Sequence, residues 1–202
     1  LNELMTYNKV PVPPTVMIAG PADFEVAAQT LGFPLVLKIP DSSFSRGVKK
    51  ASTFDELKTL ATQWLEDSDL LIAQKFIPTE YDWRIGVLGG QPLFAVHYLM
   101  AKKHWQIVNH DTNGGKPDAG GFKIFTLKET PSHVIDTAVK AARCIGDGLY
   151  GVDLKETKDG IFVIEVNDNP DLDHGCEDGG EKDEVWTRLT QWFLDRLERQ
   201  GR

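Results

Sequence analysis

The chain has 202 residues, of which 41% are hydrophobic and 26% charged, and its formal net charge is −8 at pH 7. These values are ordinary for a soluble globular protein; no apolar run approaches the roughly 20 residues of a membrane-spanning helix, and the acidic balance argues against a nucleic-acid-binding surface. The two cysteines fit neither a disulfide framework nor a metal motif, and no secretion signal opens the sequence, so a cytoplasmic location is expected.

Helical and strand patterns alternate along the chain. Hydrophobic periodicity and capping residues predict helices over residues 2–9, 22–31, 53–66, 131–145 and 184–197. Apolar or alternating runs predict strands over residues 15–18, 35–39, 47–51, 70–76, 83–88, 92–99, 122–127, 149–156 and 161–167. Residues 102–121 and 168–180 are polar and Gly-containing, and we expect loops there. The predicted fold class is α+β with mostly antiparallel sheet.

Three helices carry more specific expectations. In the helix over 53–66, Thr53 and Glu56 form a capping box. Thr130 is expected to be the N-cap of the helix over 131–145, with Pro131 at its first helical position. In the last helix, the residues expected to face inward are Val185, Leu189, Trp192 and Phe193.

The strongest chemical signal is the hairpin predicted from residues 149–167. Glu165 and Asn167 alternate along its second strand and therefore share a face. A three-residue turn over residues 158–160, with Gly160 left-handed, would place Asp153 opposite Glu165 on that same face. The hairpin would thus bring two carboxylates and one amide close together.

Two carboxylates that lie close together repel each other unless a proton or a cation separates them. Oxygen ligands of this kind suit a hard cation such as Mg²⁺, which completes its shell with water and phosphate. Phe162, Ile164 and Val166 are expected to cover the opposite face of the strand. The other interpretations are a solvated acidic strand face and an acid/base pair of the kind that glycosidases use.

A lysine inside a strand and a loop of small residues point to phosphate. Lys38 lies in the apolar run 34–40, where an ammonium group needs a compensating anion unless it is an edge-strand lysine whose head reaches water. Ser43, Ser45 and Gly47 follow in a loop that could direct hydroxyls and backbone N–H groups at phosphate oxygens. The alternative for this loop is an ordinary Ser-rich turn.

The end of the strand over 70–76 could hold a base. Gln74, Lys75, Phe76 and Ile77 could offer backbone groups to an adenine edge, with the last two side chains as apolar walls. An ordinary strand exit is the alternative.

Three charged residues follow that strand end. Glu80 or Asp82 could accept hydrogen bonds from ribose hydroxyls. Arg84 could hold a phosphoryl group through two hydrogen bonds, or form an ion pair with Asp82 or Glu80.

Taken in order, these motifs make the chain resemble the ATP-grasp superfamily and, within it, the RimK-like amino-acid ligases. The resemblance covers nearly the whole chain. Its pieces are Val10–Thr15, the Leu35–Lys38 strand, the small-residue loop, Gln74–Ile77, Asp82-x-Arg84, and Gly151-Val152-Asp153 followed by Glu165-Val166-Asn167-Asp168-Asn169-Pro170. The last motif is quite specific for the superfamily, whereas each earlier motif is weak alone.

The resemblance implies two lobes of mostly antiparallel sheet with helices, and ATP bound between them. Residues 1–77 would form the leading helix and the smaller lobe, and residues 78–202 the larger lobe with the metal site. The implied roles are ATP phosphate binding by Lys38, coverage of the phosphates by the loop from Ser43 to Gly47, adenine binding by Gln74 to Ile77, and binding of Mg²⁺, or Mn²⁺ in its place, by Asp153, Glu165 and Asn167.

The implied activity is ATP-dependent ligation of a carboxylate to an amine. The carboxylate attacks the γ-phosphate to give an acyl phosphate and ADP, and the amine then displaces phosphate to form an amide. Metal ions and cationic side chains would stabilise the transferring phosphoryl group. The implied partners are ATP and an amino-acid, peptide or small-molecule carboxylate and amine, with no nucleic acid and no membrane. A homo-oligomer is among the open assembly states.

The chain also departs from the family pattern. The phosphate loop is Ser-rich where relatives carry several glycines, and residues 99–103 stand where relatives commonly carry arginines, which leaves Lys102 as the candidate catalytic cation beside Arg84. Relatives also have an upstream domain, so we expect this chain to be the ATP-grasp part of a longer protein. The alternative functions are a nucleotide-binding module without turnover and an acid/base hydrolase that uses Asp153 and Glu165.

Overall fold

The computed structural model describes residues 1–40, 47–102, 104–109 and 118–200. Its contacts divide the chain into two compact units. The small unit comprises Pro13–Pro78 with Val108–Asp118, and the large unit comprises Leu1–Val12, Thr79–Ile107 and Ala119–Arg202. No helix in the described ranges is both long enough and apolar enough to cross a membrane.

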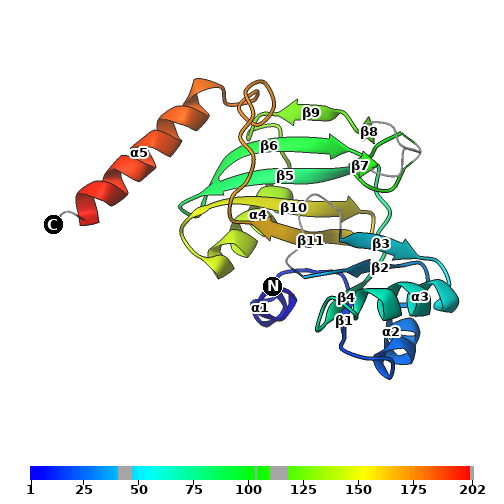
Figure 1. Ribbon diagram of the computed structural model, residues 1–202. Helices are drawn as coiled ribbons and strands as arrows, with labels where there is room; N and C mark the ends of the chain where they lie inside the picture. The colour runs from blue at the N-terminus through cyan, green and yellow to red at the C-terminus, as the bar shows by residue number, and fades with distance from the viewer. Residues whose placement is uncertain (41–46, 103, 110–117, 201–202) are drawn as a thin grey trace. The chain divides into compact units, whose positions relative to one another are not determined.

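The small unit is a four-stranded antiparallel sheet with helices on one face (Figure 1). Its strands are β1 (Thr15–Ile18), β2 (Leu35–Lys38), β3 (Val48–Ala51) and β4 (Leu71–Lys75), in the order β1-β4-β2-β3. Helices α2 (Asp23–Leu31) and α3 (Phe54–Trp64) contribute buried Phe24, Leu31 and Leu57 to the core beneath the sheet. Half of the predicted capping box is present: Thr53 Oγ1 accepts from Glu56 N at 3.2 Å, whereas Glu56 Oε2 accepts at 2.7 Å from the N–H of Ser52, the residue before the N-cap.

The large unit is built on a five-stranded antiparallel sheet in the order β11-β10-β5-β6-β9. These strands are β5 (Tyr81–Leu88), β6 (Gln91–Leu99), β9 (Phe122–Phe125), β10 (Leu149–Thr157) and β11 (Gly160–Asn167). The helices of this unit are α1 (Asn2–Tyr7), α4 (Ser132–Ile145) and α5 (Asp183–Gln200). Two short strands, β7 (Val108–Asn109) and β8 (Asp118–Ala119), pair within the stretch that the sequence predicts as a long loop, and all of their residues except Ala119 belong to the small unit.

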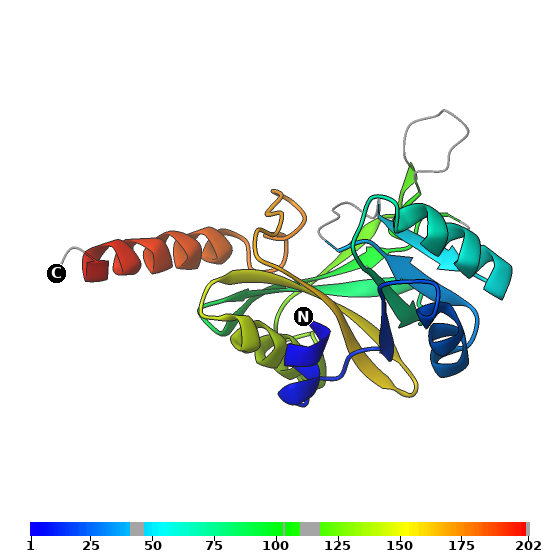
Figure 2. The ribbon, with the colours of Figure 1, turned by 60° about the horizontal axis from the view of Figure 1, so that its bottom comes forward.

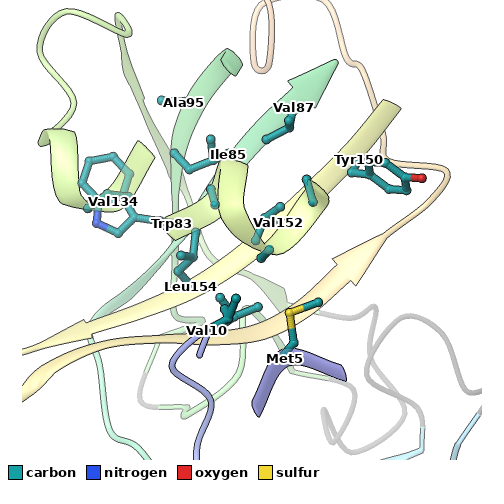
Figure 3. Packing of buried hydrophobic residues seen from close by; sticks show 14 residues of the cluster. Met5, Val10, Trp83, Ile85, Val87, Ala95, Val134, Tyr150, Val152 and Leu154 are labelled. Carbon is teal, nitrogen blue, oxygen red and sulfur yellow. The ribbon is translucent and has the colours of Figure 1, made fainter. Parts of the chain in front are cut away.

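One face of the five-stranded sheet is a closed apolar core (Figure 3). Ile85, Val152 and Leu154 are completely buried on this face, and α4 lies across it with Val134, Ala138, Ala141 and Ala142, also completely buried. The small side chains of α4 allow its backbone to approach the sheet closely. This core fixes the positions of β5 and β10, and so of the residues that point to the opposite face.

The opposite face is partly covered by the segment that follows β11. Residues 168–182, which we call the C-terminal loop, bring Leu172 and Cys176 against Phe94 and Val96 of β6. The helix α5 follows and extends away from the sheet (Figure 2). Its stripe of Val185, Leu189 and Trp192 packs on the same apolar cluster, at the spacing of one helix face. The C-terminal loop therefore lies directly on the sheet face that the core leaves open.

Most predicted elements are confirmed within a few residues, and every strand pair of the two large sheets is antiparallel. The prediction of Thr130 as the N-cap of α4 is wrong: the helix begins at Ser132 after Pro131, and the Thr130 hydroxyl donates to Thr126 O at 2.9 Å. The inward orientation of Phe193 is also wrong. Its side chain is 51% exposed, because it lies about 100° around the helix from its half-buried neighbour Trp192.

The first twelve residues belong to the large unit by their contacts, whereas the family resemblance implies that they lie with the smaller lobe. Met5 and Val10 are buried in the core beneath α4, at 0% and 3% exposure. Val163 N of β11 also donates to Pro11 O at 2.8 Å. The other expected boundary, between residues 77 and 78, lies one residue from the observed change of unit after Pro78.

Candidate functional site

The hairpin of β10 and β11 places Asp153 directly opposite Glu165, as predicted. The prediction reaches this register through two compensating differences. The turn has two residues rather than three, because Thr157 pairs with Gly160, and a bulge at Ile164 then restores the expected pairing at Asp153. Gly160 has a φ of 137°, in the region that favours glycine.

The bulge changes which side chains face the core. Ile161 and Val163 contact the core, and Val163 is 1% exposed. Because the bulge inserts a residue, Val166 returns to the core face, while Glu165 and Asn167 point to the other face. The predicted set of Phe162, Ile164 and Val166 on the core side is therefore correct only for Val166.

Arg84 of β5 forms a two-pronged ion pair with Asp153 of β10. These residues are directly opposite in the sheet; Arg84 Nε donates to Asp153 Oδ1, and Arg84 Nη2 donates to Oδ2 at 2.9 Å. Both side chains are nearly nine-tenths buried. Burial alone would lower the pKa of the Arg84 guanidinium, but the charge and hydrogen bonds of Asp153 raise that pKa above its usual value. The guanidinium is thus a permanent cation beside this carboxylate, paired with Asp153 rather than with Asp82 or Glu80.

Asn167 completes a cluster of oxygen-bearing side chains. Its Nδ2 donates to Asp153 Oδ2 and to Gly151 O, both at 3.4 Å, and Glu165 is exposed beside them. The charge of Glu165 also contributes to the raised pKa of Arg84, after the larger contribution of Asp153. Gly151 sits at the floor of the cluster, where a Cβ would lie 2.7 Å from Pro170 Cβ and 3.2 Å from Arg84 Cδ.

The donor set fits a hard divalent cation. Within the described ranges, no group of three or more His, Cys, Asp or Glu side chains is arranged to hold a metal by itself. Two carboxylates and an amide are instead an incomplete oxygen shell, of the kind that Mg²⁺ completes with water and substrate phosphates. Asp153, Glu165 and Asn167 could therefore hold a metal that arrives with a phosphorylated ligand.

A second ion pair lies along the same two strands. Lys155 Nζ donates to Asp82 Oδ1 at 2.6 Å and to Thr79 Oγ1 at 2.8 Å, and the Thr79 hydroxyl donates to Asp82 Oδ1 at 3.0 Å. Asp82 is 8% exposed, and burial raises the pKa of its carboxyl despite the opposing charge of Lys155. Of the two carboxylates predicted as ribose contacts, Asp82 is thus bonded to Lys155 and Thr79, whereas Glu80 is exposed.

In the small unit, register places Lys38 and Gln74 on the same sheet face. Val36 is paired with Gln74, and Lys38 lies two residues further along β2, so both side chains point away from the helix-covered face. Gln74 is 4% exposed and its Nε2 donates to Thr15 Oγ1 at 3.2 Å. This sheet face therefore carries the half-buried Lys38 and the amide of Gln74, with the apolar Val36 paired with Gln74.

The other predicted nucleotide residues are less closely grouped. Lys75 points to the opposite face and is exposed, while its backbone N donates to Pro14 O at 2.9 Å. Phe76 and Ile77 are half-buried just after β4, and Gly47 is buried, with its carbonyl accepting from Ile39 N at 2.9 Å. Ser43 and Ser45 lie outside the described residues. In the large unit, Lys102 is exposed beyond the end of β6.

Several charged or polar residues near these sites escaped the sequence analysis. Lys50 of β3 shares the sheet face of Lys38, and its Nζ lies 4.9 Å from the centroid of the Phe76 ring. Lys155 could have been found, because it alternates with Asp153 on β10. Tyr98 and Glu177, whose side chains are hydrogen-bonded to each other, are 79 residues apart and left no local signal.

Comparison with known proteins gives a consistent family. The sequence matches the RimK-like ATP-grasp domain over residues 2–181. It is 28% identical to "Probable alpha-L-glutamate ligase" of Thioalkalivibrio sulfidiphilus, covering 85% of this chain and 54% of that protein. It is also 28% identical to "Alpha-aminoadipate--LysW ligase LysX" of Saccharolobus solfataricus, covering 83% of this chain and 59% of that protein. The chain thus spans little more than half the length of these relatives.

Solved structures share the fold at lower sequence identity. D-alanine–D-alanine ligase from Bacillus anthracis superimposes with a TM-score of 0.73 at 18% identity, over 98% of this chain and 67% of that one. The RimK domain ATP-grasp protein from Sphaerobacter thermophilus gives a TM-score of 0.65 at 20% identity, over 91% and 62%. The predicted ATP-grasp fold is confirmed, and the chain belongs to the RimK-like ATP-grasp family.

Proposed function

We propose that this chain is the nucleotide- and metal-binding part of an ATP-dependent ligase that joins a carboxylate to an amine and releases ADP. The observation that carries the proposal is the cross-strand pair of Asp153 and Glu165, with Asn167 beside it and Arg84 bound to Asp153. This is an oxygen-donor set next to a permanent cation, which suits a divalent metal bound to phosphate. The relatives are named as ligases that act on amino acids.

In this proposal the residues have distinct roles. Asp153, Glu165 and Asn167 hold Mg²⁺, which Mn²⁺ could replace, and the metal neutralises the negative charge of the ATP phosphates. Arg84 keeps the Asp153 carboxylate in one orientation through both of its oxygens. Lys38 contributes a cation toward phosphate, and the backbone from Gln74 to Ile77 receives adenine.

The chemical step that follows from these roles is transfer of the γ-phosphoryl group to a substrate carboxylate. The resulting acyl phosphate is then attacked by an amine, which forms the amide bond as inorganic phosphate leaves. Arg84 is the cation that the described part of the large unit holds closest to the candidate metal ligands, whereas Lys102 is exposed. Both carboxylate oxygens of Asp153 accept from Arg84, which favours a binding role for Asp153 over the acid/base role of a hydrolase.

The test is calorimetric titration of the 202-residue chain with ADP, with and without Mg²⁺, on wild type and Glu165→Ala. We expect a metal-dependent gain in affinity that the variant loses, while both proteins keep the same weaker affinity without metal. A matched control is Glu184→Ala, which removes an acid from the start of α5 instead. Equal metal dependence in wild type and Glu165→Ala would overturn the assignment of the metal site.

A screen for ADP release then separates a ligase from a binding module. ATP and Mg²⁺ are supplied with single amino acids, with pairs of amino acids and with peptides. Release that needs both a carboxylate and an amine supports the ligase. Metal-dependent nucleotide binding without release in any pair supports the module without turnover.

A further inference from the structure

Arg84 lies near two parts of the large unit that the proposed metal set does not include, Tyr98 and the start of the C-terminal loop. Its guanidinium carbon lies 5.3 Å from the centroid of the Tyr98 ring, on the neighbouring strand β6. On the other side, Arg84 and Pro170 both crowd the open side of Gly151. Pro170 belongs to the C-terminal loop, so the loop touches the surroundings of the Arg84–Asp153 pair at its beginning.

The same loop also contacts Tyr98, the residue over Arg84, through a buried carboxylate. Glu177 is 2% exposed; its Oε1 accepts from the Tyr98 hydroxyl and its Oε2 accepts from Asp173 N at 2.9 Å. A carboxylate buried to this degree is costly unless hydrogen bonds satisfy it. Burial and the hydrogen bond to Glu177 both raise the pKa of Tyr98, so its hydroxyl stays a donor across the physiological pH range.

We propose that Tyr98 and Glu177 form a latch that holds the C-terminal loop against Arg84, and that both are positioning residues for the candidate metal ligand Asp153. The path runs through three direct contacts: Glu177 with the Tyr98 hydroxyl, the Tyr98 ring with the Arg84 guanidinium, and Arg84 with both oxygens of Asp153. With the latch closed, Arg84 has one orientation and Asp153 presents its oxygens in one geometry. With the latch open, the loop can lift from Gly151 and Arg84 gains rotameric freedom.

Other anchors of the loop do not reach this pair. Glu181 Oε1 accepts from Leu127 N at 2.7 Å, and Asp178 Oδ2 accepts from Trp186 Nε1 at 2.8 Å, which ties the loop to the segment after β9 and to α5. These anchors would keep the end of the loop in place if the latch were broken. Removing the Tyr98 hydroxyl is therefore expected to free the middle of the loop without unfolding the unit.

The experiment compares wild type with Tyr98→Phe, which deletes the hydroxyl and keeps the ring over Arg84. Tyr150→Phe is the matched control, because Tyr150 is a 9% exposed tyrosine of β10 that packs with the opposite core. The first readout is hydrogen exchange at Asp173 N, which the latch protects through Glu177. We expect this exchange to be at least about 10-fold faster in Tyr98→Phe and unchanged in Tyr150→Phe.

The second readout is the Mg²⁺ affinity measured at saturating ADP. Residues that orient a metal ligand typically change metal affinity by about 10-fold or more, so we expect about a 10-fold loss in Tyr98→Phe and no change in the metal-free ADP affinity. A purely structural role would weaken both affinities together. Faster loop exchange with unchanged Mg²⁺ affinity would overturn the coupling, and unchanged exchange would overturn the latch.

This inference rests on the proposed function, and the two can fail separately. If wild type shows no metal-dependent ADP binding, the proposed function fails, and the exchange experiment alone decides whether Tyr98 and Glu177 hold the loop. If wild type binds Mg²⁺ with ADP and Tyr98→Phe does so equally well, the metal site stands and the positioning role falls. A melting temperature close to that of wild type confirms that the variant is folded.

Discussion

The two faces of the five-stranded sheet differ in almost every physical respect, although they alternate residue by residue along the same strands. On one face Ile85, Val152 and Leu154 are completely buried beneath α4. On the other face Arg84 and Asp153 form a largely buried ion pair next to the exposed Glu165. Because neighbouring residues of a strand point in opposite directions, the sheet separates stability from chemistry within a single tripeptide, Val152-Asp153-Leu154.

This separation has an energetic reason. A buried ion pair contributes little net stability, because the loss of hydration offsets the attraction of the charges. Burial of the apolar face, in contrast, stabilises the folded state in proportion to the apolar area removed from water. The apolar core therefore supplies the stability that keeps the polar face ordered. We expect substitutions in the core to lower stability and substitutions on the polar face to change ligand binding.

The largest expected effect is on the apolar face. Leu154→Ala removes a completely buried side chain beneath α4 and should lower the free energy of unfolding by about 3 to 5 kcal/mol. Urea denaturation measures this loss. Metal-dependent ADP binding, measured at a temperature where the variant is folded, should be unchanged. A stability change below about 1 kcal/mol would mean that the core face is not the source of rigidity.

The next effect concerns His97, the polar residue that intrudes on the apolar face. It is 8% exposed and stacked on Tyr81 at 3.7 Å, next to Trp83 and Phe125, and its Nε2 has no hydrogen-bond partner in the described part of the chain. Burial, followed by the charge of Lys123, lowers its pKa from 6.5 to about 4, while Glu156 opposes the shift. The protonated form is thus disfavoured in the folded state.

The sign of the pH dependence follows from this lowered pKa. Above pH 6.5 His97 is neutral in both states, whereas between pH 6.5 and about 4 only the unfolded chain takes up the proton, so stability falls as the pH falls through that window. Across this pH window the free energy of unfolding is expected to fall by about 3 kcal/mol. His97→Phe should remove this part of the slope, seen as a smaller loss of stability between pH 7 and pH 5 than in wild type. Equal slopes in the two proteins would contradict the assignment to His97.

On the polar face, Glu165→Gln removes one charge and little volume. We expect about a 100-fold loss of metal-dependent ADP affinity, equivalent to about 2.7 kcal/mol, because one oxygen ligand loses its charge. Thermal melting should be nearly unchanged, because Glu165 is exposed and contributes little to the core. If Glu165→Gln lowered the melting temperature but kept the metal-dependent ADP affinity, the roles assigned to the two faces would be wrong.

The sequence predicts much of this face and not all of it. Alternation is local, so it predicts that Glu165 and Asn167 share a face. The pairing of Asp153 with Glu165 agrees with the prediction only because the shorter turn and the unpredicted bulge at Ile164 offset each other. The ion pair of Arg84 with Asp153 depends on β5 lying beside β10, and no local pattern tells which strands become neighbours. Local reasoning therefore offered a phosphoryl group, Asp82 or Glu80 as partners of Arg84 and did not include Asp153.

The hydrogen bond between Tyr98 and Glu177 is beyond local prediction for the same reason. Glu177 lies in a stretch that the sequence marks only as an acidic loop, yet tertiary contacts bury it to 2% exposure. The fold class and most helices could be predicted because periodicity and capping are local signals. The details that orient the candidate metal ligands arise from strand order and loop packing, which depend on the whole unit.

The smallest expected effect belongs to the hairpin turn, which serves both faces equally. Gly160 has a φ of 137°, and a Cβ there would meet no atom within 4 Å, so Gly160→Ala introduces backbone strain without a clash. We expect a loss of about 1 kcal/mol in the free energy of unfolding, with unchanged metal-dependent ADP affinity, because the bulge at Ile164 lies between the turn and Glu165. The same two quantities, the free energy of unfolding and the metal-dependent ADP affinity, are measured for Val163→Ala, which lies on the core side of the bulge. If Gly160→Ala weakened Mg²⁺ binding as strongly as Glu165→Gln, the turn rather than the bulge would set the register of the two carboxylates.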